Sequence, residues 1–217
     1  MTDVSAIDIA AVRREYAGAS LDLSVLDADP FAQARTWLDD ALRAEIVDAT
    51  AMTLATADAA GRPGARTVLL KHFDRAGFVF FTSYVSRKAR DLDANPRAAL
   101  LFHWREVSRQ LVVEGRVERV SDAESSEYFA TRPRGSQLAA AVSPQSREVP
   151  DRAWLEDRVA ALEARLGDTT VPRPEDWGGY RVVPDRIEVW QGRENRLHDR
   201  FEYRLVDGGW RIARLAP

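Results

Sequence analysis

The sequence contains no cysteine, two methionines and three histidines among 217 residues. Without cysteine the chain can form neither a disulfide nor a thiolate metal site, and we predict no metal centre. Its apolar runs are all shorter than the ~20 residues that a membrane-spanning helix needs. The first ten residues, MTDVSAIDIA, have neither the basic start nor the apolar core of a secretion signal. We therefore expect a cytoplasmic protein that does not enter a membrane.

Neither sign of charge is in large excess. The chain has 31 Lys and Arg residues and 34 Asp and Glu residues, which gives a formal net charge of −3. A general nucleic-acid binder normally presents a broad basic face, so this composition argues against nucleic acid as a partner. An anionic ligand must instead be held by local arginine clusters. The length suits one sizeable domain.

Helical periodicity is clearest at three places. Asp29-Pro30 is typical of a helix start, because a carboxylate cap precedes a proline at the first helical position. An apolar stripe at helical spacing then runs to about residue 47: Phe31, Ala34, Leu38, Ala41 and Leu42. Ser121 and Glu124 form a capping box that opens a second helix. Residues 151–166, with Asp151 as the cap, carry the clearest helical stripe and predict a third.

Strand periodicity dominates the rest of the chain. Residues 51–57, 65–71 and 78–82 are separated by short polar loops, which predicts an antiparallel meander. More strands are expected at 97–104, 108–120, 177–183, 186–192, 201–206 and 210–215. Pro184 is expected to separate the strand at 177–183 from the strand at 186–192. The fold class that follows is mainly β: an antiparallel barrel with flanking helices. We predict a single domain over residues 29–217, preceded by a mobile N-terminal arm over residues 1–28.

Polar donors gather in four separate segments, at residues 66–71, 82–88, 132–137 and 193–200. Guanidinium groups suit phosphate or carboxylate recognition. Each segment alone also has a plain explanation: a solvated basic pair, a helix connector or an exposed arginine-rich hairpin. Together, on a small barrel, the four segments suggest a ligand with more than one phosphate, or two phosphorylated ligands.

Two pairs of residues within these segments leave alternatives open. Arg66 and Lys71 are five residues apart, so in a regular strand they face opposite sides. If both are ligands, either they serve different groups or the strand is bent. Arg87 and Lys88 fall in the first turn of a short helix capped by Ser86, where cations are unfavourable unless an anion binds there. The alternative is that Arg87 pairs with Asp91 one turn later.

The segments occur in an ordered set: RTVLLK, FFTSYVSRKARDLDANP, RQLVVEG, YFATRPRGSQ, SPQS, WGGYR and WQGRENRLHDR, ending in RLAP. This set resembles the pyridoxine (pyridoxamine) 5′-phosphate oxidase family, and the likeness extends from about Arg13 to Pro217. The resemblance implies an FMN-binding split barrel that forms a homodimer, with the FMN sites at the subunit interface. It implies oxidation of pyridoxine 5′-phosphate or pyridoxamine 5′-phosphate to pyridoxal 5′-phosphate. Hydride passes from substrate C4′ to flavin N5, and O2 reoxidises the flavin and gives H2O2.

The resemblance also implies the roles of individual residues. The FMN ligands, some of them from the second subunit, are Arg66, Lys71, Phe81, Thr82, Arg87, Lys88, Gln110, Gln145, Ser146, Trp190 and Arg200. The substrate phosphate is assigned to Lys71, Tyr128, Arg132 and Ser136. Arg196 and His198 are the catalytic residues, placed over the substrate ring, and we expect them to orient it more than to exchange protons. Arg13, Arg14 and Tyr16 match an arm that can close over the site.

Phe81 is a departure, because many family members have tyrosine there. His72 and His103 are expected to be structural. Two alternatives share the flavin ligands: a related FMN oxidase of another ring substrate, of the phenazine-pathway type, and a non-catalytic flavin-binding split barrel. The substrate-phosphate set, Tyr128 with Arg132 and Ser136, argues against the first. The intact Arg196-Leu-His198 motif argues against the second.

Overall fold

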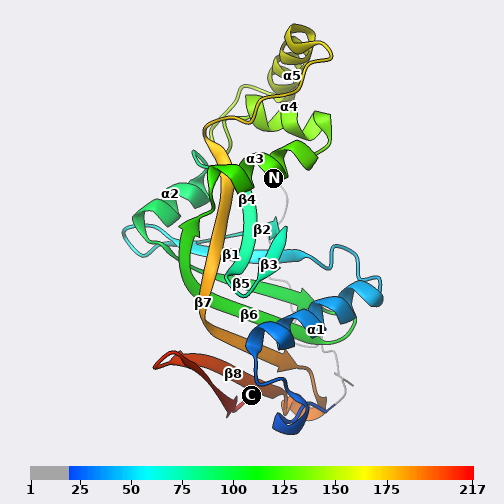
Figure 1. The fold of residues 1–217 in the computed structure, drawn as a ribbon, viewed down its shortest axis with the longest axis vertical. Coiled ribbons are helices and arrows are strands. Elements are labelled where there is room, and N and C mark those ends of the chain that lie inside the picture. The colour runs from blue at the N-terminus through cyan, green and yellow to red at the C-terminus, as the bar shows by residue number, and fades with distance from the viewer. Residues whose placement is uncertain (1–19) are drawn as a thin grey trace, which may run out of the picture.

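A computed structural model describes residues 20–217, in which a nine-stranded, wholly antiparallel sheet curls on itself with helices around it (Figure 1). The strands are β1 Ala51–Ala57, β2 Pro63–Leu69, β3 His72–Asp74, β4 Gly77–Ser83, β5 Arg97–Trp104, β6 Arg109–Arg119, β7 Trp177–Gln191, β8 Asp199–Val206 and β9 Gly209–Leu215. The helices are η1 Leu23–Val25, α1 Pro30–Arg43, α2 Arg87–Ala94, α3 Asp122–Thr131, α4 Arg134–Val142, α5 Arg152–Leu166 and η2 Glu194–Arg196. The predicted mainly β, antiparallel fold class with flanking helices is confirmed.

The order of the strands differs from the predicted meander. The sheet runs β2-β1-β5-β6-β7-β4-β3, with β8 on β7 and β9 on β8. β2 and β4 therefore belong to opposite ends of the sheet, although only a short segment joins them in sequence. The chain crosses between them at Leu70, whose N–H donates to Thr50 O, and Lys71, whose N–H donates to Val79 O, both at 2.9 Å. Local periodicity predicts where strands lie but not which strands pair, which is why the meander was wrong here.

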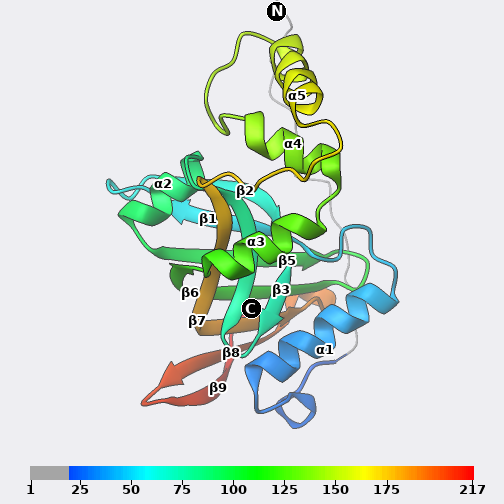
Figure 2. The same ribbon diagram turned by 45° about the horizontal axis from the view of Figure 1, so that its top comes forward.

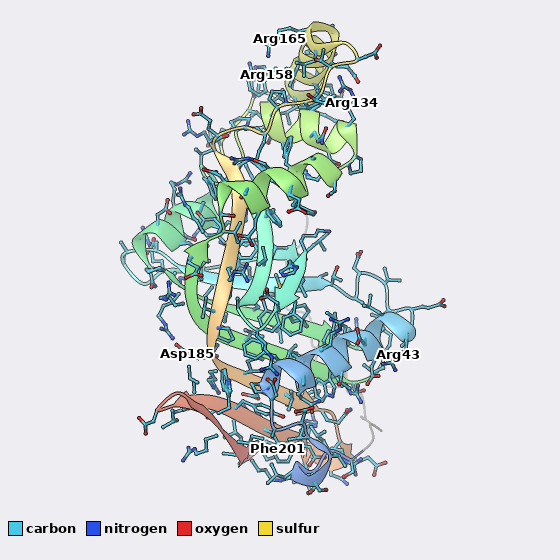
Figure 3. The ribbon with its side chains drawn as sticks, in the orientation of Figure 1. Arg43, Arg134, Arg158, Arg165, Asp185 and Phe201 are labelled. Atoms are coloured by element: carbon cyan, nitrogen blue, oxygen red, sulfur yellow. The ribbon has the colours of Figure 1, made fainter. Side chains whose placement is uncertain are left out.

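The prediction that Pro184 interrupts the strand was also wrong. β7 is one strand of 15 residues, and it continues through Pro184. The ladder to β6 shifts there: Gly115 pairs with Pro184 while Glu114 pairs with Arg186, which leaves Asp185 as an extra residue at the bend (Figure 3). Proline lacks an N–H and is tolerated in a strand at such a bulge. A Cβ built on Gly115 would lie 2.0 Å from Val183 O, so glycine is needed for the close approach.

Helix α1 begins where the sequence predicted, since the Asp29 carboxylate accepts the Phe31 N–H at 3.0 Å. It ends at Arg43 instead of near residue 47. Trp37 lies in the buried face of the helix, whereas Leu42 is 51% exposed, so its place in the predicted stripe was wrong. Glu45 has φ 50°, a left-handed conformation that ends the helical path.

Helices α3, α4 and α5 form a lobe beyond one end of the barrel, opposite the β8–β9 hairpin (Figures 1 and 2). The Ser121–Glu124 capping box opens α3 and the Asp151 cap opens α5, both as predicted. No residue of α5 is fully buried. Its apolar stripe packs at the edge of a small cluster of Phe129, Leu138, Val171 and Trp177, separate from the barrel core.

The described part of the predicted arm, residues 20–28, contacts the C-terminal strands. Leu21 is buried and its N–H donates to Asp199 Oδ2 at 3.1 Å, while the Tyr203 hydroxyl donates to Asp27 O at 2.8 Å. Arg13, Arg14 and Tyr16, the residues matched to an arm that can close over the site, lie outside the described residues. Within residues 20–217, no helix combines the length and apolar character needed to cross a bilayer.

Candidate functional site

A cavity of about 650 Å³ opens between β2, β4 and the α3–α4 turn. Predicted ligands of both kinds line it. From the FMN set these are Arg66, Lys71, Phe81, Thr82, Lys88 and Gln145, and from the substrate set Lys71, Tyr128, Arg132 and Ser136. Three of the four predicted donor segments thus meet in one place. Lys71 and Lys88 are also the two lysines of the whole sequence.

Arg66 and Lys71 reach the same cavity because β2 ends at Leu69 and the chain turns before Lys71. The open alternative of a bent strand is therefore the one found. The Arg66 guanidinium is largely fixed from behind: Nη1 donates to Thr56 Oγ1 at 2.7 Å and to Leu54 O at 3.1 Å. Nη2 lies 3.4 Å from Asp91 Oδ2. Burial lowers the pKa of Arg66; Asp91 opposes this shift and the charge of Arg87 adds to it.

Lys88 is a buried cation held by neutral partners. Its ammonium donates to Thr82 Oγ1 at 3.1 Å and to Gln145 Oε1 at 2.9 Å. In the described part of the chain, its hydrogen bonds and ion pairs include no carboxylate. Burial, and then the charge of Arg66, lower the pKa of Lys88 to about 8. A buried charge without a counter-ion is costly, so an anion bound here would be strongly favoured.

Arg87 lies beside this group, at the start of α2, where the Ser86 side chain caps the helix as predicted. The alternative pairing of Arg87 with Asp91 is not found among residues 20–217, since Asp91 instead bonds to Thr56 and Arg66. The Arg87 guanidinium points to Gly64: a Cβ built there would lie 3.7 Å from Arg87 Nη2 and 2.8 Å from Arg66 Nη2. Two guanidinium groups thus converge over one glycine.

Arg132 is another cation that lines the cavity. Its guanidinium lies 4.8 Å from the Trp177 ring centroid and 5.6 Å from that of Phe129. Within residues 20–217, its buried Nη1 has no hydrogen-bond partner. Burial lowers the pKa of Arg132, and Tyr128 opposes this. An orphaned, buried donor on a cation is suited to an anionic oxygen.

Part of the cavity wall is aromatic and consists of Phe81, Tyr128 and Trp177. Phe81 stacks on Tyr128 at 4.1 Å between ring centroids and on Trp177 at 5.6 Å. The departure from tyrosine at Phe81 therefore leaves an apolar ring in this stack. Sequence reasoning did not identify Trp177 as a lining residue; its apolar strand context gives a core signal and no ligand signal.

The remaining predicted ligands on strands lie elsewhere. Gln110, Trp190 and Arg200 are paired in one row across β6, β7 and β8, and none of them lines the cavity. Arg200 Nε donates to the buried Glu188 carboxylate at 2.8 Å. Ser146, at the loop after α4, is exposed with φ 69° and does not line the cavity either.

Arg196 and His198 belong to the loop between β7 and β8, next to this row. Asn195 and Arg196 have φ 54° and 63°, so both residues have a left-handed backbone conformation. Such a conformation is strained for arginine and is common at functional sites. The His198 ring lies 4.7 Å from the Trp190 ring. Burial, and then the Arg196 charge, lower the pKa of His198.

One chain therefore presents two groups of predicted ligands: the cavity beside α3, and a surface made of the 110–190–200 row with the 196–198 loop. Figure 2 shows that the lobe of α3–α5, which forms one side of the cavity, lies away from β8 and β9. Within a single protomer the structure does not bring the two groups together.

Known proteins give a consistent comparison. The family described as pyridoxamine 5′-phosphate oxidase matches residues 38–165, and the pyridoxine 5′-phosphate oxidase C-terminal dimerisation region matches residues 177–217. The pyridoxine/pyridoxamine 5′-phosphate oxidase of Ralstonia pickettii is 58% identical over 210 residues, which cover 96% of this chain and 99% of that protein. The protein of the same name from Rubrobacter xylanophilus is 56% identical and the alignment covers 97% of each chain.

Two solved structures share the fold. PhzG from Burkholderia lata, in complex with tetrahydrophenazine-1-carboxylic acid, has a TM-score of 0.87 at 29% identity, covering 92% of this chain and 99% of that one. A pyridoxamine 5′-phosphate oxidase-related, FMN binding protein from Nostoc punctiforme has a TM-score of 0.70 at 16% identity, covering 88% of this chain and 100% of that one. The predicted split-barrel class is confirmed, and the matched dimerisation region implies a homodimer. The chain is a member of the pyridoxamine 5′-phosphate oxidase family, a family of oxidoreductases.

Proposed function

We propose that this protein binds FMN and oxidises pyridoxine 5′-phosphate or pyridoxamine 5′-phosphate to pyridoxal 5′-phosphate. The observation that carries the proposal is a single cavity lined by four cations, Arg66, Lys71, Lys88 and Arg132, with Arg87 close to Arg66. Lys88 is held by neutral partners, and within residues 20–217 the buried Nη1 of Arg132 has no hydrogen-bond partner. Two phosphorylated molecules, one cofactor and one substrate, fit such an arrangement better than one small anion does.

In this proposal the homodimer completes each site. The row of Gln110, Trp190 and Arg200 and the loop of Arg196 and His198 come from one subunit and face the cavity of the other. This explains why the predicted ligand residues form two separate groups within one protomer.

Bound FMN would supply the redox chemistry, accepting hydride from substrate C4′ at N5 and passing electrons to O2 to give H2O2. The protein's own task is positioning. Arg66 and Lys88 hold the FMN phosphate, while Lys71, Arg132 and Ser136 hold that of the substrate. Arg196 and His198 fix the substrate ring, and the aromatic wall of Phe81, Tyr128 and Trp177 excludes water.

A related oxidase acting on another ring system is the second candidate, because the PhzG structure superposes with a TM-score of 0.87. Identity favours the first candidate: 58% to a pyridoxine/pyridoxamine 5′-phosphate oxidase against 29% to PhzG. Arg132 and Ser136 in the cavity also favour a phosphorylated substrate. A non-catalytic flavin-binding protein is disfavoured by the strained Arg196 beside His198.

The test is an anaerobic titration of the FMN-loaded protein with each substrate, followed by admission of air. Bleaching of the flavin band by either phosphorylated substrate, an aldehyde product, and recovery of the band with H2O2 in air are expected. Pyridoxine without phosphate should bleach the band far more slowly. A flavin band that ignores both phosphorylated substrates would overturn the proposal and favour another ring substrate, and failure to bind FMN would overturn it at the cofactor.

A further inference from the structure

A buried polar pair lies behind the cavity, on β1 and α2. Thr56 is 4% exposed and Asp91 is 5% exposed. The Thr56 hydroxyl donates to Asp91 Oδ2 at 2.7 Å and accepts from Arg66 Nη1, also at 2.7 Å. Neither residue lines the cavity, and both lie deeper than Arg66.

The direction of these hydrogen bonds is fixed by chemistry. An ionised carboxylate only accepts, so the Thr56 hydroxyl must donate its proton to Asp91. Its lone pairs are then left for the Arg66 guanidinium, which only donates. Asp91 therefore sets the orientation of the hydroxyl, and the hydroxyl holds Arg66.

Apart from this pair, Arg66 Nη1 donates to Leu54 O at 3.1 Å, and the rest of its surroundings do little to fix it. It lies on β2, which is hydrogen-bonded to β1 on one side only. Its side chain passes over Gly64, where a Cβ would lie 2.8 Å from Nη2. The guanidinium of Arg87 approaches the same point, and like charges repel. Without the pair, the Arg66 guanidinium would be expected to move away from Arg87 toward solvent.

We propose that Thr56 and Asp91 are positioning residues that hold the Arg66 guanidinium, beside that of Arg87, in the orientation that receives the FMN phosphate. This inference rests on the proposed function, because it takes FMN as the cofactor. It predicts that the pair acts on the phosphate of the cofactor and not on its ring. Riboflavin, which has the same ring without a phosphate, separates the two effects.

The experiment measures the dissociation constants of FMN and riboflavin for the apoprotein by flavin fluorescence. Thr56→Val keeps the shape of the side chain and removes the hydroxyl. Loss of one hydrogen bond to a charged group predicts FMN binding weaker by about tenfold, with riboflavin binding unchanged. Thr56→Ser, which retains the hydroxyl, should bind FMN as the unaltered protein does. Thr53→Val is the matched control, an exposed threonine of the same strand.

A double-mutant cycle tests that the effect passes through Arg66. Arg66→Met should weaken FMN and spare riboflavin, and adding Thr56→Val to it should cause no further loss. Gly64→Ala gives a second route should Thr56→Val fold poorly. Its Cβ displaces Arg66 directly, without a left-handed backbone to strain, and should reproduce the selective loss of FMN affinity.

Three outcomes would overturn the inference: equal weakening of FMN and riboflavin, no weakening of FMN by Thr56→Val, or full additivity with Arg66→Met. The proposed function is scored separately by anaerobic bleaching. If the flavin band bleaches with phosphorylated substrate but any of these outcomes is found, the proposed function stands and the positioning role of Thr56 and Asp91 is rejected. A protein that binds no FMN loses both.

Discussion

His198 accepts a hydrogen bond at Nδ1 from the backbone N–H of Arg193, at 3.0 Å. In this state the ring is neutral and its proton is on Nε2, because Nδ1 can accept only when it carries no proton. Burial and the nearby Arg196 charge lower the pKa of His198, so the neutral ring is favoured at neutral pH. The proton on Nε2 makes that atom a hydrogen-bond donor and not a base, which agrees with the positioning role proposed for His198.

The first prediction follows for His198→Asn. An amide can replace the donor but not the ring stacked near Trp190, so we expect KM to rise about tenfold while kcat changes little. Steady-state kinetics of the FMN-loaded protein measure both constants. A large loss of kcat with unchanged KM would contradict the positioning role and indicate proton transfer.

The pH dependence gives an additional check on this tautomer. Protonation of Nδ1 would set one N–H against the Arg193 N–H, so the contact holds above the pKa of His198. The pKa of His198 lies below its ordinary value of 6.5. Substrate affinity should therefore fall as the pH drops through this lowered pKa. The His198→Asn variant should lack this acid limb.

The second prediction concerns Lys88, whose pKa is lowered to about 8 by burial and the charge of Arg66. As the pH rises through 8, Lys88 of the apoprotein loses its proton, and with it the attraction for a phosphate dianion. FMN affinity should therefore fall between pH 8 and 10, whereas riboflavin affinity should not. Fluorescence titrations across this range measure the effect.

Lys88→Arg is the control for that experiment. A guanidinium keeps its charge throughout this pH range, so the alkaline fall in FMN affinity should disappear. The same alkaline fall in both proteins would show that another group is responsible.

The third prediction separates two neighbouring arginines. Arg132→Met removes the orphaned donor from the cavity, so KM for the phosphorylated substrate should rise by about tenfold to a hundredfold with FMN affinity retained. Arg134 donates to Gly167 O and Thr169 O and thus ties α4 to the end of α5, in the lobe where Figure 3 labels it. Arg134→Met should lower the melting temperature and leave KM almost unchanged. Equal effects on KM from both variants would indicate that the lobe, and not Arg132, binds the phosphate.

The sequence was sufficient for much of the fold, because caps and periodicity act locally. Asp29, Ser86, Ser121 and Asp151 all cap the helices that they were expected to cap. Strand pairing was not predictable from local signals, since β2 and β4 are separated in sequence only by the short β3 and yet belong to opposite ends of the sheet. Nor could periodicity show that the ladder shift opposite Gly115 would accommodate Pro184.

The candidate site shows the same division. Motifs predicted ligands that the structure places in one cavity, such as Lys88 and Arg132. Thr56 and Asp91 were missed because they are 35 residues apart and lie on different elements. A contact between such residues arises only when the chain is folded. The Arg66–Asp91 contact in particular replaces the helical Arg87–Asp91 pairing that local spacing had suggested.

The last prediction tests whether two subunits share each site. Arg132→Ala damages the cavity and Arg196→Ala damages the β7–β8 loop, so each homodimer should be nearly inactive. In a mixed dimer, the intact cavity of one chain can face the intact loop of the other, which restores one of the two sites. Two distinguishable affinity tags on the co-expressed variants allow the heterodimer to be isolated. Its activity should be about half that of the unaltered protein.

The control is a heterodimer of Arg132→Ala with Lys71→Ala, two changes in the same cavity, with one cavity damaged in each chain. If sites are shared between subunits, neither cavity is intact and no activity returns. If instead each subunit used its own loop, the Arg132→Ala and Arg196→Ala heterodimer would also remain inactive, because each chain would carry one damaged half. Recovery in the first heterodimer and none in the second therefore distinguishes a shared site from two self-contained ones.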